Sequence, residues 1–388
     1  MFKNAIEVVR IFGFKIRVDP SWFLIAALVV WGLSSTHFPS ELPGYSDRSY
    51  VLFSTVAMLG LFGSVILHEL AHSLMARRFG LNVGSITLFI FGGVAELETE
   101  PRDPVSEFWI AIAGPVMSVL LAGFSYLMMA NLGSSSGNLP LVAIMKYLWQ
   151  INLLLAVFNM VPAFPLDGGR IFRAALWAFK SDLLFATRIA SRFGLVFGAF
   201  LILAGVLGLV LQIGVGGFWY IIIGFFIVSA SQNSYRSLIN KRALQGQTVE
   251  RLMTPNPTTV TPGQHISDVV QNVMLPSNIS FLPVQQNDQL LGYIDLQMVN
   301  KIDRDKWNDV TVAEVYRPKS DDNTIAATTA LQDLLKKMSE TGKRKQMITD
   351  GKTLLGIVSL ADLLNYLALR TNLDQPPDGR AVHSVSSS

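Results

Sequence analysis

Long apolar stretches separated by short polar segments fill the first 230 residues of the chain. Six stretches carry almost no charge: residues 21–34, 50–67, 108–130, 141–164, 193–213 and 214–230. A helix needs roughly 20 apolar residues to cross a bilayer, so the pattern predicts about six transmembrane helices. The first and last stretches are short, and only a glycine-rich turn divides the fifth from the sixth, so this count can be off by one.

After residue 240 the pattern becomes that of a soluble α/β protein, and it repeats. The first unit has a helix at 266–274 and strands at 281–284 and 291–294; the second has a helix at 330–339, strands at 346–348 and 354–358, and a final helix from Leu360. Each unit is too small to bury a core alone, so we expect the two to pack together.

The predicted fold class is therefore a multi-span α-helical membrane domain followed by an α/β pair of repeats. We expect the membrane domain to cover residues 1–240, and the two repeats to cover 241–305 and 306–371. The tail, 372–388, is rich in proline, glycine and serine, and we expect it to be disordered.

The composition supports an integral membrane protein and excludes several other classes. Of 388 residues, 51% are hydrophobic and 15% are charged. The net charge of +3 is small and its basic residues are dispersed, which argues against nucleic acid as a partner. The chain has no cysteine, so disulfides and thiolate ligands are excluded, and metal chemistry must come from His, Asp and Glu.

The basic residues also predict the orientation in the bilayer. They lie before the first stretch, between the second and third, between the fourth and fifth, and after the sixth, while the alternate loops contain almost none. Cytoplasmic loops carry the excess of Lys and Arg, so both termini and the repeats are expected in the cytoplasm. No convincing cleavage site follows the basic N-terminus, so we expect the first apolar stretch to be retained.

The second stretch ends in the motif His-Glu-Leu-Ala-His, residues 68–72. On a helix, His68 and His72 lie one turn apart on one face, so both imidazoles can reach one metal ion with Glu69 beside it. Two such nitrogens suit Zn²⁺, whose catalytic sites need a third ligand and a position for water. The alternative is a hydrogen-bonded histidine pair that joins two helices. Ionisable side chains beside an apolar segment are costly unless compensated, and a metal would compensate all three.

The best candidate for the third ligand follows the fourth stretch, which breaks at Pro162 and Pro165 just before Asp167. Prolines interrupt a helix, and the backbone freed near the membrane must find partners. Asp167 follows this break at the cytoplasmic depth inferred for the histidines. Glu96 and Glu107 are the alternative ligands, and we expect both to lie in more polar surroundings.

Two further segments are expected near the metal. Residues 86–96 have the composition of a strand, and Gly92-Gly93 within it indicates a tight bend or a close backbone approach. We predict a hairpin beside the metal whose free edge could hold an extended peptide; the alternative is an interfacial loop that only packs. Asn159, about two turns before Asp167 if that segment were regular, could donate to substrate or to a developing oxyanion.

Together these motifs resemble those of the site-2 protease family of intramembrane zinc metalloproteases. The resemblance covers residues 1–240 and rests on four motifs: His68-Glu69-x-x-His72, Gly92-Gly93, Ala113-Gly114-Pro115 and Asn159-x-x-Pro162-x-x-Pro165-x-Asp167-Gly168. It implies one zinc ion per chain, bound by His68, His72 and Asp167. It further implies that Glu69 is the catalytic residue and that Asn159, Gly92 and Gly93 contact substrate.

The repeats resemble a tandem pair of cystathionine-β-synthase (CBS) domains, over residues 247–369. In that family a G-x-x-S/T-x-x-D pattern holds a ribose, and residues 356–362 match it through Ser359 and Asp362. The first repeat has Met298 in place of the carboxylate. The resemblance therefore implies at most one adenine nucleotide, AMP or ATP. CBS pairs also serve purely as dimerisation units, so a structural role and a homodimer stay open.

The leading hypothesis is regulated intramembrane proteolysis. The substrate would be a single-span membrane protein in the lipid bilayer, such as a membrane-held transcriptional regulator or an anti-sigma factor, and the CBS pair would modulate cleavage. The alternative is a CBS-regulated metal-binding membrane transporter, in which His68, His72 and Asp167 would line a transport path. Glu69→Gln separates the two, because a protease with this change should keep zinc but lose turnover.

Overall fold

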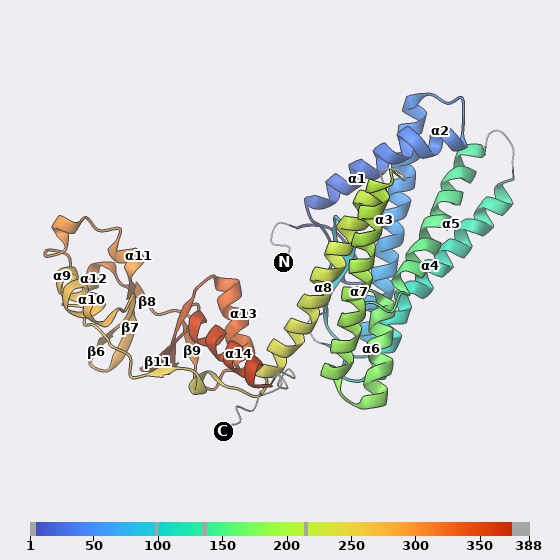
Figure 1. The fold of residues 1–388 in the computed structure, drawn as a ribbon. Coiled ribbons are helices and arrows are strands. Elements are labelled where there is room, and N and C mark those ends of the chain that lie inside the picture. Colours follow the sequence, from blue (N-terminus) through green and yellow to red (C-terminus); the bar gives the residue numbers. More distant parts are fainter. Residues whose placement is uncertain (1–4, 98–99, 134–137, 213–215, 375–388) are drawn as a thin grey trace, which may run out of the picture. The chain divides into compact units, whose positions relative to one another are not determined.

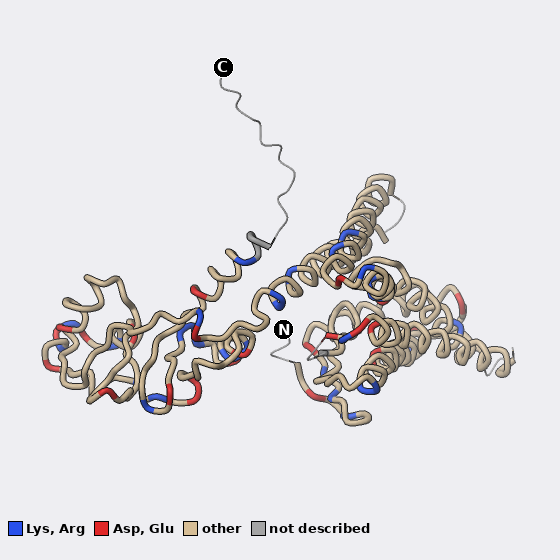
Figure 2. The backbone as a smooth tube through the Cα atoms, turned by 90° about the horizontal axis from the view of Figure 1, so that it is seen from below, with Lys and Arg blue, Asp and Glu red and all other residues tan. Residues whose placement is uncertain are grey.

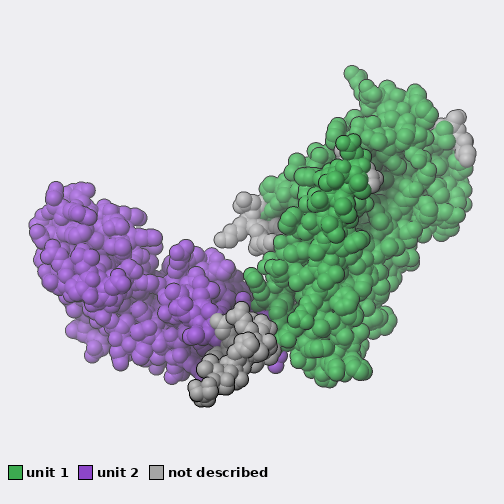
Figure 3. All heavy atoms as spheres, in the orientation of Figure 1, with its two compact units in different colours: residues 1–236 green, residues 237–388 purple. Residues whose placement is uncertain are grey.

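The computed structural model describes residues 5–97, 100–133, 138–212 and 216–374. The chain divides into two compact units, Met1–Arg236 and Ser237–Ser388 (Figure 3). Of the tail expected to be disordered, residues 372–374 belong to the last helix, and residues 375–388 lie outside the described part of the chain.

Unit 1 is dominated by long helices that run side by side (Figure 1). The helices of this part of the chain are α1 (Ser21–Gly32), the short α2 (Phe38–Glu41), α3 (Asp47–Arg78), α4 (Pro104–Leu132), α5 (Leu139–Asn159), α6 (Asp167–Lys180), α7 (Leu183–Val210) and α8 (Gly216–Leu244), with a π-helical turn at Leu33–His37 between α1 and α2. The residues of α8 after Arg236 belong to unit 2. Charged residues are sparse along these helices (Figure 2).

Within the described residues, five helical segments are long and apolar enough to cross a membrane: Ser21–Glu41, Asp47–Arg78, Pro104–Leu132, Leu139–Asn159 and Leu183–Val210. These segments coincide with the first five apolar stretches, which confirms the prediction of a multi-span helical domain. The sixth stretch, residues 214–230, lies largely in α8, which continues beyond it into polar sequence as far as Leu244.

Polar side chains determine where three of these helices begin. The side chains of Ser46, Asp103 and Asp182 each accept a hydrogen bond from a backbone N–H in the first turn of α3, α4 and α7, respectively. Such caps satisfy N–H groups that have no partner within the helix. The chain between α5 and α6 turns sharply, with the Leu166 N–H donating to the Ala163 carbonyl at 2.9 Å, so that α6 begins at Asp167.

A four-stranded sheet lies within the same unit. Its strands are β1 (Ile6–Ile11), β2 (Phe14–Val18), β3 (Val83–Phe89) and β4 (Gly92–Leu97), in the order β1-β2-β3-β4. β3 and β4 form the predicted hairpin, and β2 pairs with β3 in parallel. Strands β1 and β2 were not predicted. Phe14 and Ile86 of the sheet pack on Leu70 of α3. Leu70 lies between His68 and His72 in the sequence.

Helices α7 and α8 make close backbone contact through glycines. A Cβ atom on Gly198 would lie 2.8 Å from the carbonyl oxygen of Gly224, and one on Gly205 would lie 2.5 Å from that of Gly217. Small residues allow membrane helices to approach this closely. The contact lets Ser231 of α8 donate a hydrogen bond to the carbonyl of Phe164, in the turn before α6.

Unit 2 contains the two predicted repeats. Their elements are β5 (Thr254–Pro255), α9 (Ile266–Asp268), α10 (Leu275–Ser277), β6 (Phe281–Gln286), β7 (Gln289–Asp295) and α11 (Leu296–Val299), then α12 (Val312–Val315), β8 (Arg317–Pro318), β9 (Thr324–Ala326), α13 (Leu331–Thr341), β10 (Lys345–Asp350), β11 (Thr353–Ser359) and α14 (Leu360–Asp374). A π-helical segment, Val269–Met274, joins α9 to α10.

The repeats share strands and core, as expected from their small size. The sheets run β5-β11-β10-β9 and β6-β7-β8, so β5 from the first repeat completes the sheet of the second. Each repeat has its own buried cluster, centred on Leu282 and Ile294 in the first and on Leu334 and Ile348 in the second. A further cluster packs Phe281 and Tyr293 of the first repeat against Met347 of the second.

Candidate metal centre

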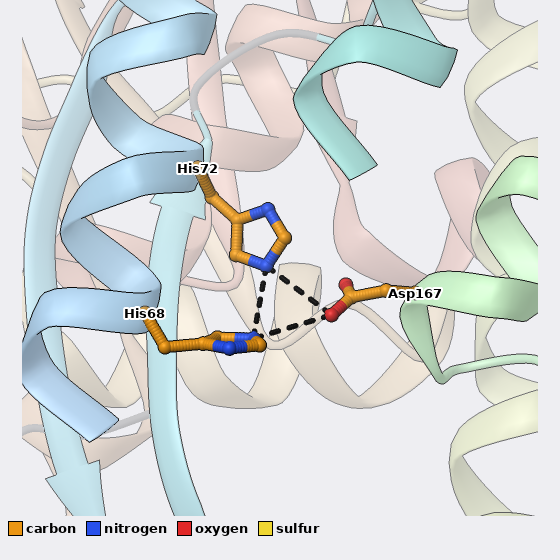
Figure 4. Close-up of side chains that lie close together, drawn as sticks. All are labelled: His68, His72 and Asp167. Carbon is orange, nitrogen blue, oxygen red and sulfur yellow. Dashed lines mark hydrogen bonds and ion pairs between the residues drawn. The ribbon is translucent and has the colours of Figure 1, made fainter. Parts of the chain in front are cut away.

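Helices α3 and α6 bring two imidazoles and a carboxylate together (Figure 4). Nε2 of His68 and Nε2 of His72 lie 3.2 and 3.3 Å from Oδ2 of Asp167, and the two Nε2 atoms are 3.1 Å apart. His68, His72 and Asp167 are buried, with exposed fractions of 3%, 6% and 9%. Among the described residues this is the one group of His, Asp and Glu placed to hold a metal ion.

The spacing and chemistry of these groups fit zinc. Tetrahedral zinc with bonds of about 2.0–2.1 Å holds its ligand atoms roughly 3.3–3.4 Å apart, close to the separations found here. Nδ1 of His72 lies 2.6 Å from the Ile110 carbonyl oxygen, which can only accept, so Nδ1 carries the proton. In the neutral ring Nε2 then points a lone pair at the Asp167 carboxylate. That arrangement is favourable only when a cation or a proton lies between them.

Helix α4 orients both rings. Besides the Ile110 carbonyl, the hydroxyl of Ser118 lies 2.9 Å from Nδ1 of His68. Gly114 lies between these two positions, and a Cβ atom there would be 2.1 Å from Nε2 of His72 and 2.5 Å from Nε2 of His68. Only glycine leaves room for the rings where they stand.

A cavity of 180 Å³ lies beside two of the ligands, His72 and Asp167, and Glu69 also lines it. Strand β4 forms another wall through Gly93, Val94 and Ala95. A Cβ atom on Gly93 would lie 2.8 Å from Cγ of Glu69, so the glycine allows β4 to approach the carboxylate. Gly92 has φ +124°, a conformation that side-chain-bearing residues rarely adopt, at the turn into β4.

The other site residues expected from the sequence lie elsewhere. Asn159 is the last residue of α5 and is not among the described residues that line the cavity. Glu107 is 0% exposed and paired with Arg173, so the expectation that it lies in polar surroundings is wrong. The prediction for Glu96 stays untested, because its side chain lies outside the part of the chain that the structure describes.

In unit 2, Ser359 and Asp362 bond to one another. The N–H and hydroxyl of Ser359 donate to Oδ2 of Asp362 at 2.8 and 2.7 Å, at the start of α14. Lys345 lies nearby and donates to the Ser280 hydroxyl at 3.1 Å. Burial lowers the pKa of Lys345, and the negative charges of Asp362 and Asp295 oppose that change. A hydroxyl, a carboxylate and an ammonium group therefore lie at the junction of the repeats.

Sequence reasoning missed Ile110, Ser118, Arg170 and Arg173. Ile110 acts through its carbonyl, which no side-chain motif reports. Arg170 lines the cavity three residues after Asp167, and Arg173 binds Glu107. Arg170 and Arg173 stand beside apolar sequence, which could have marked them as candidates for the site. A charged residue that becomes buried needs a partner of opposite charge.

Comparison with known proteins identifies the family. The model for peptidase family M50 matches residues 56–136 and 127–204. The "Putative zinc metalloprotease sll0528" of Synechocystis is 32% identical over 368 residues, which cover 94% of this chain and 96% of that protein. The "Putative zinc metalloprotease Rip3" of Mycobacterium tuberculosis is 32% identical over 367 residues, covering 94% and 93%. The chain belongs to the site-2 protease family.

The site-2 protease family resemblance, the enzyme class and the fold class predicted from the sequence are thereby confirmed. A solved site-2 protease from Methanocaldococcus jannaschii is 28% identical, with a TM-score of 0.43, and covers 60% of this chain and 95% of that one. The CBS-domain model matches residues 249–302 and 312–369. This site-2 protease is an integral membrane zinc metalloprotease with a CBS pair, and the transporter alternative is set aside.

Proposed function

We propose that this protein cleaves peptide bonds within or near the transmembrane helices of single-span membrane proteins. In this proposal His68, His72 and Asp167 bind one zinc ion, and Glu69 is the catalytic residue. The observation that carries it is the convergence of three buried ligand atoms within 4.8 Å of one another, beside a cavity that Glu69 also lines.

When bound, zinc would polarise the scissile carbonyl and lower the pKa of a water molecule. Glu69 would take a proton from that water and pass it to the leaving amine, since its side chain lines the same cavity as Asp167. The Ile110 carbonyl and the Ser118 hydroxyl keep the imidazoles oriented during these steps. Burial shields the three ligands from bulk solvent.

The substrate must unwind locally before it is cut. A helix with its side chains is about 10–12 Å across. A cavity of 180 Å³ is too small to hold a turn of such a helix. An extended segment could instead pair with β4, which has no further neighbour in the described part of its sheet. In this proposal Gly92 and Gly93 allow the peptide backbone to approach Glu69, and Asn159 contacts the substrate beyond the cavity.

We further propose that the termini and the CBS pair are cytoplasmic, because basic residues collect in alternate loops. We also propose the domain limits expected from the sequence: 1–240 for the protease domain, and 241–305 and 306–371 for the two CBS domains. Ser359 and Asp362 are proposed to hold the ribose of one AMP or ATP, which would modulate cleavage. A homodimer through the CBS pair is part of the same proposal. A membrane-held transcriptional regulator or an anti-sigma factor is the proposed type of substrate.

The decisive experiment uses the full chain in detergent with a labelled single-span helix as substrate. The parent protein should cleave it, and a chelator should abolish cleavage until zinc is restored. Glu69→Gln should retain one zinc per chain while losing turnover by several orders of magnitude. Cleavage that survives both Glu69→Gln and chelation would refute the proposal.

Nucleotide modulation has a separate test. Calorimetric titration of the full chain with AMP and with ATP should give one site per chain, and Asp362→Ala should abolish it. The cleavage rate should change when that site is filled. Equal heats in parent and variant, or a rate unaffected by either nucleotide, would leave the CBS pair with a structural role.

A further inference from the structure

A second set of buried charges lies beside the metal centre. Glu107, in the first turn of α4, is 0% exposed, and Arg173 of α6 is 7% exposed. Nε and Nη2 of Arg173 both donate to Oε1 of Glu107, the Nε contact at 2.7 Å. Oε2 of Glu107 has no hydrogen-bond partner within the described residues. Because an uncompensated buried charge is costly, each of these two charges depends on the other.

Arg173 also contacts the turn that leads to Asp167. Its guanidinium carbon lies 4.9 Å from the centre of the Phe164 ring. The N–H of Phe164 donates to the Ala190 carbonyl at 3.4 Å, and the carbonyl of Phe164 accepts from the Ser231 hydroxyl. The residue three positions before the carboxylate ligand is thus held by α6, α7 and α8.

Glu107 lies on the face of α4 that orients the histidine rings. Ile110, Gly114 and Ser118 follow it at intervals that place all four residues on one side of a helix. The Ile110 carbonyl and the Ser118 hydroxyl contact the Nδ1 atoms of His72 and His68. Helix α4 therefore orients two ligands, and helix α6 carries the third.

We propose that the Glu107–Arg173 ion pair is a positioning pair, which fixes Asp167 relative to the two histidines and so determines zinc affinity. A slip of α6 along α4 by one residue is about 1.5 Å, whereas zinc–ligand distances tolerate only about 0.2 Å. The inference rests on the proposed function, because it assumes zinc at His68, His72 and Asp167.

The test uses the full chain with Glu107→Gln, with Arg173→Met, and with both changes together. Each single variant leaves one buried charge uncompensated, whereas the double variant removes both, so its zinc-free thermal stability should return close to that of the parent. Zinc affinity, measured by competition with a chelator, should still be weaker by about 10-fold or more. The visible absorption of the Co²⁺-loaded double variant should also differ from the parent. A double variant that binds zinc within twofold of the parent overturns the proposal.

Another ion pair of unit 1 provides the control. Nζ of Lys146 bonds both carboxylate oxygens of Glu41, at 3.0 and 2.8 Å, between α5 and α2. Glu41→Gln with Lys146→Met should leave zinc affinity unchanged. This ion pair joins α5 to α2, whereas the metal ligands lie on α3 and α6.

If the double variant does not fold, Arg173→Lys decides the question. Lysine keeps the charge but loses the planar pair of donors. Zinc affinity about 10-fold weaker supports the positioning role, and unchanged affinity overturns it. A different result would show that the proposed function itself is wrong. If Asp167→Ala, made in the otherwise unchanged protein, left zinc affinity unchanged, Asp167 would not be a zinc ligand.

Discussion

Gly114→Ala tests how closely the rings of the metal centre are confined. The added Cβ would stand 2.1 Å from Nε2 of His72 and 2.5 Å from Nε2 of His68. Nonbonded atoms settle at roughly 3.5 Å or more, so His72 would have to retreat by roughly 1.4 Å. Its Nδ1 bond to the Ile110 carbonyl, at 2.6 Å, opposes that movement.

The expected loss is large and specific. A displacement of about 1 Å in a catalytic group costs on the order of 100-fold in rate, and disturbed ligand orientation costs about 10–100-fold in metal affinity. Gly114→Ala should therefore lose cleavage by about 100-fold and retain less zinc after dialysis, as measured by atomic absorption. Helix stability should not fall through propensity, because alanine is favoured over glycine by roughly 1 kcal/mol.

Gly123 is a matched control on the same helix. A Cβ atom there would meet nothing within 4 Å. Gly123→Ala should keep zinc content and cleavage at the parent level, with thermal stability equal or slightly raised. The reasoning is refuted if Gly114→Ala cleaves and binds zinc within threefold of the parent, or if both alanine variants lose zinc alike.

Three further changes give separable outcomes. Ser118→Ala removes the hydroxyl 2.9 Å from Nδ1 of His68, so zinc should bind about 10-fold more weakly by chelator competition. Gly93→Ala places a Cβ 2.8 Å from Cγ of Glu69, so turnover should fall by about 10-fold or more while zinc content is unchanged. Leu334→Ala empties a fully buried position in the second CBS repeat, which should cost about 2–5 kcal/mol of unfolding free energy in denaturant titrations without altering zinc content.

The sequence predicted the local geometry of the centre well. The spacing of His68 and His72 is fixed once the segment is a helix, because four residues make about one turn. The break before Asp167 could also be anticipated, since Pro162 and Pro165 interrupt a helix, whereas helix α6 itself was not predicted. Apolar length alone predicted the five segments of the described chain that are long and apolar enough to cross a membrane, together with a sixth that is not among them.

The features that were not predicted depend on contacts between segments far apart in the sequence. The parallel pairing of β2 with β3 joins the N-terminus to a strand after α3, and neither strand alone indicates its partner. Glu107 was expected in polar surroundings, yet helix packing buries it against Arg173. The Ile110 carbonyl shows no residue-specific signal at all.

The buried charged and metal-ligating groups of the described membrane unit fall into two sets. Glu107 and Arg173 neutralise each other. The second set places the negative charge of the Asp167 carboxylate against the imidazoles of His68 and His72, in residues that are at most 9% exposed. Such a charge is costly in an apolar interior. The centre therefore favours a positive charge between its ligand atoms, either a metal ion or a proton.

Bound zinc should compensate this charge and stabilise the fold. Zinc at 100 times its dissociation constant should add about 2.7 kcal/mol to the parent, or roughly 5–10 °C in melting temperature for a unit of this size. Asp167→Asn keeps the shape but removes the charge, so the zinc-induced shift should nearly disappear. Glu69→Gln should keep it, because Glu69 is proposed to handle protons and not to bind the metal. An undiminished shift in Asp167→Asn would mean that the carboxylate is not what attracts the ion.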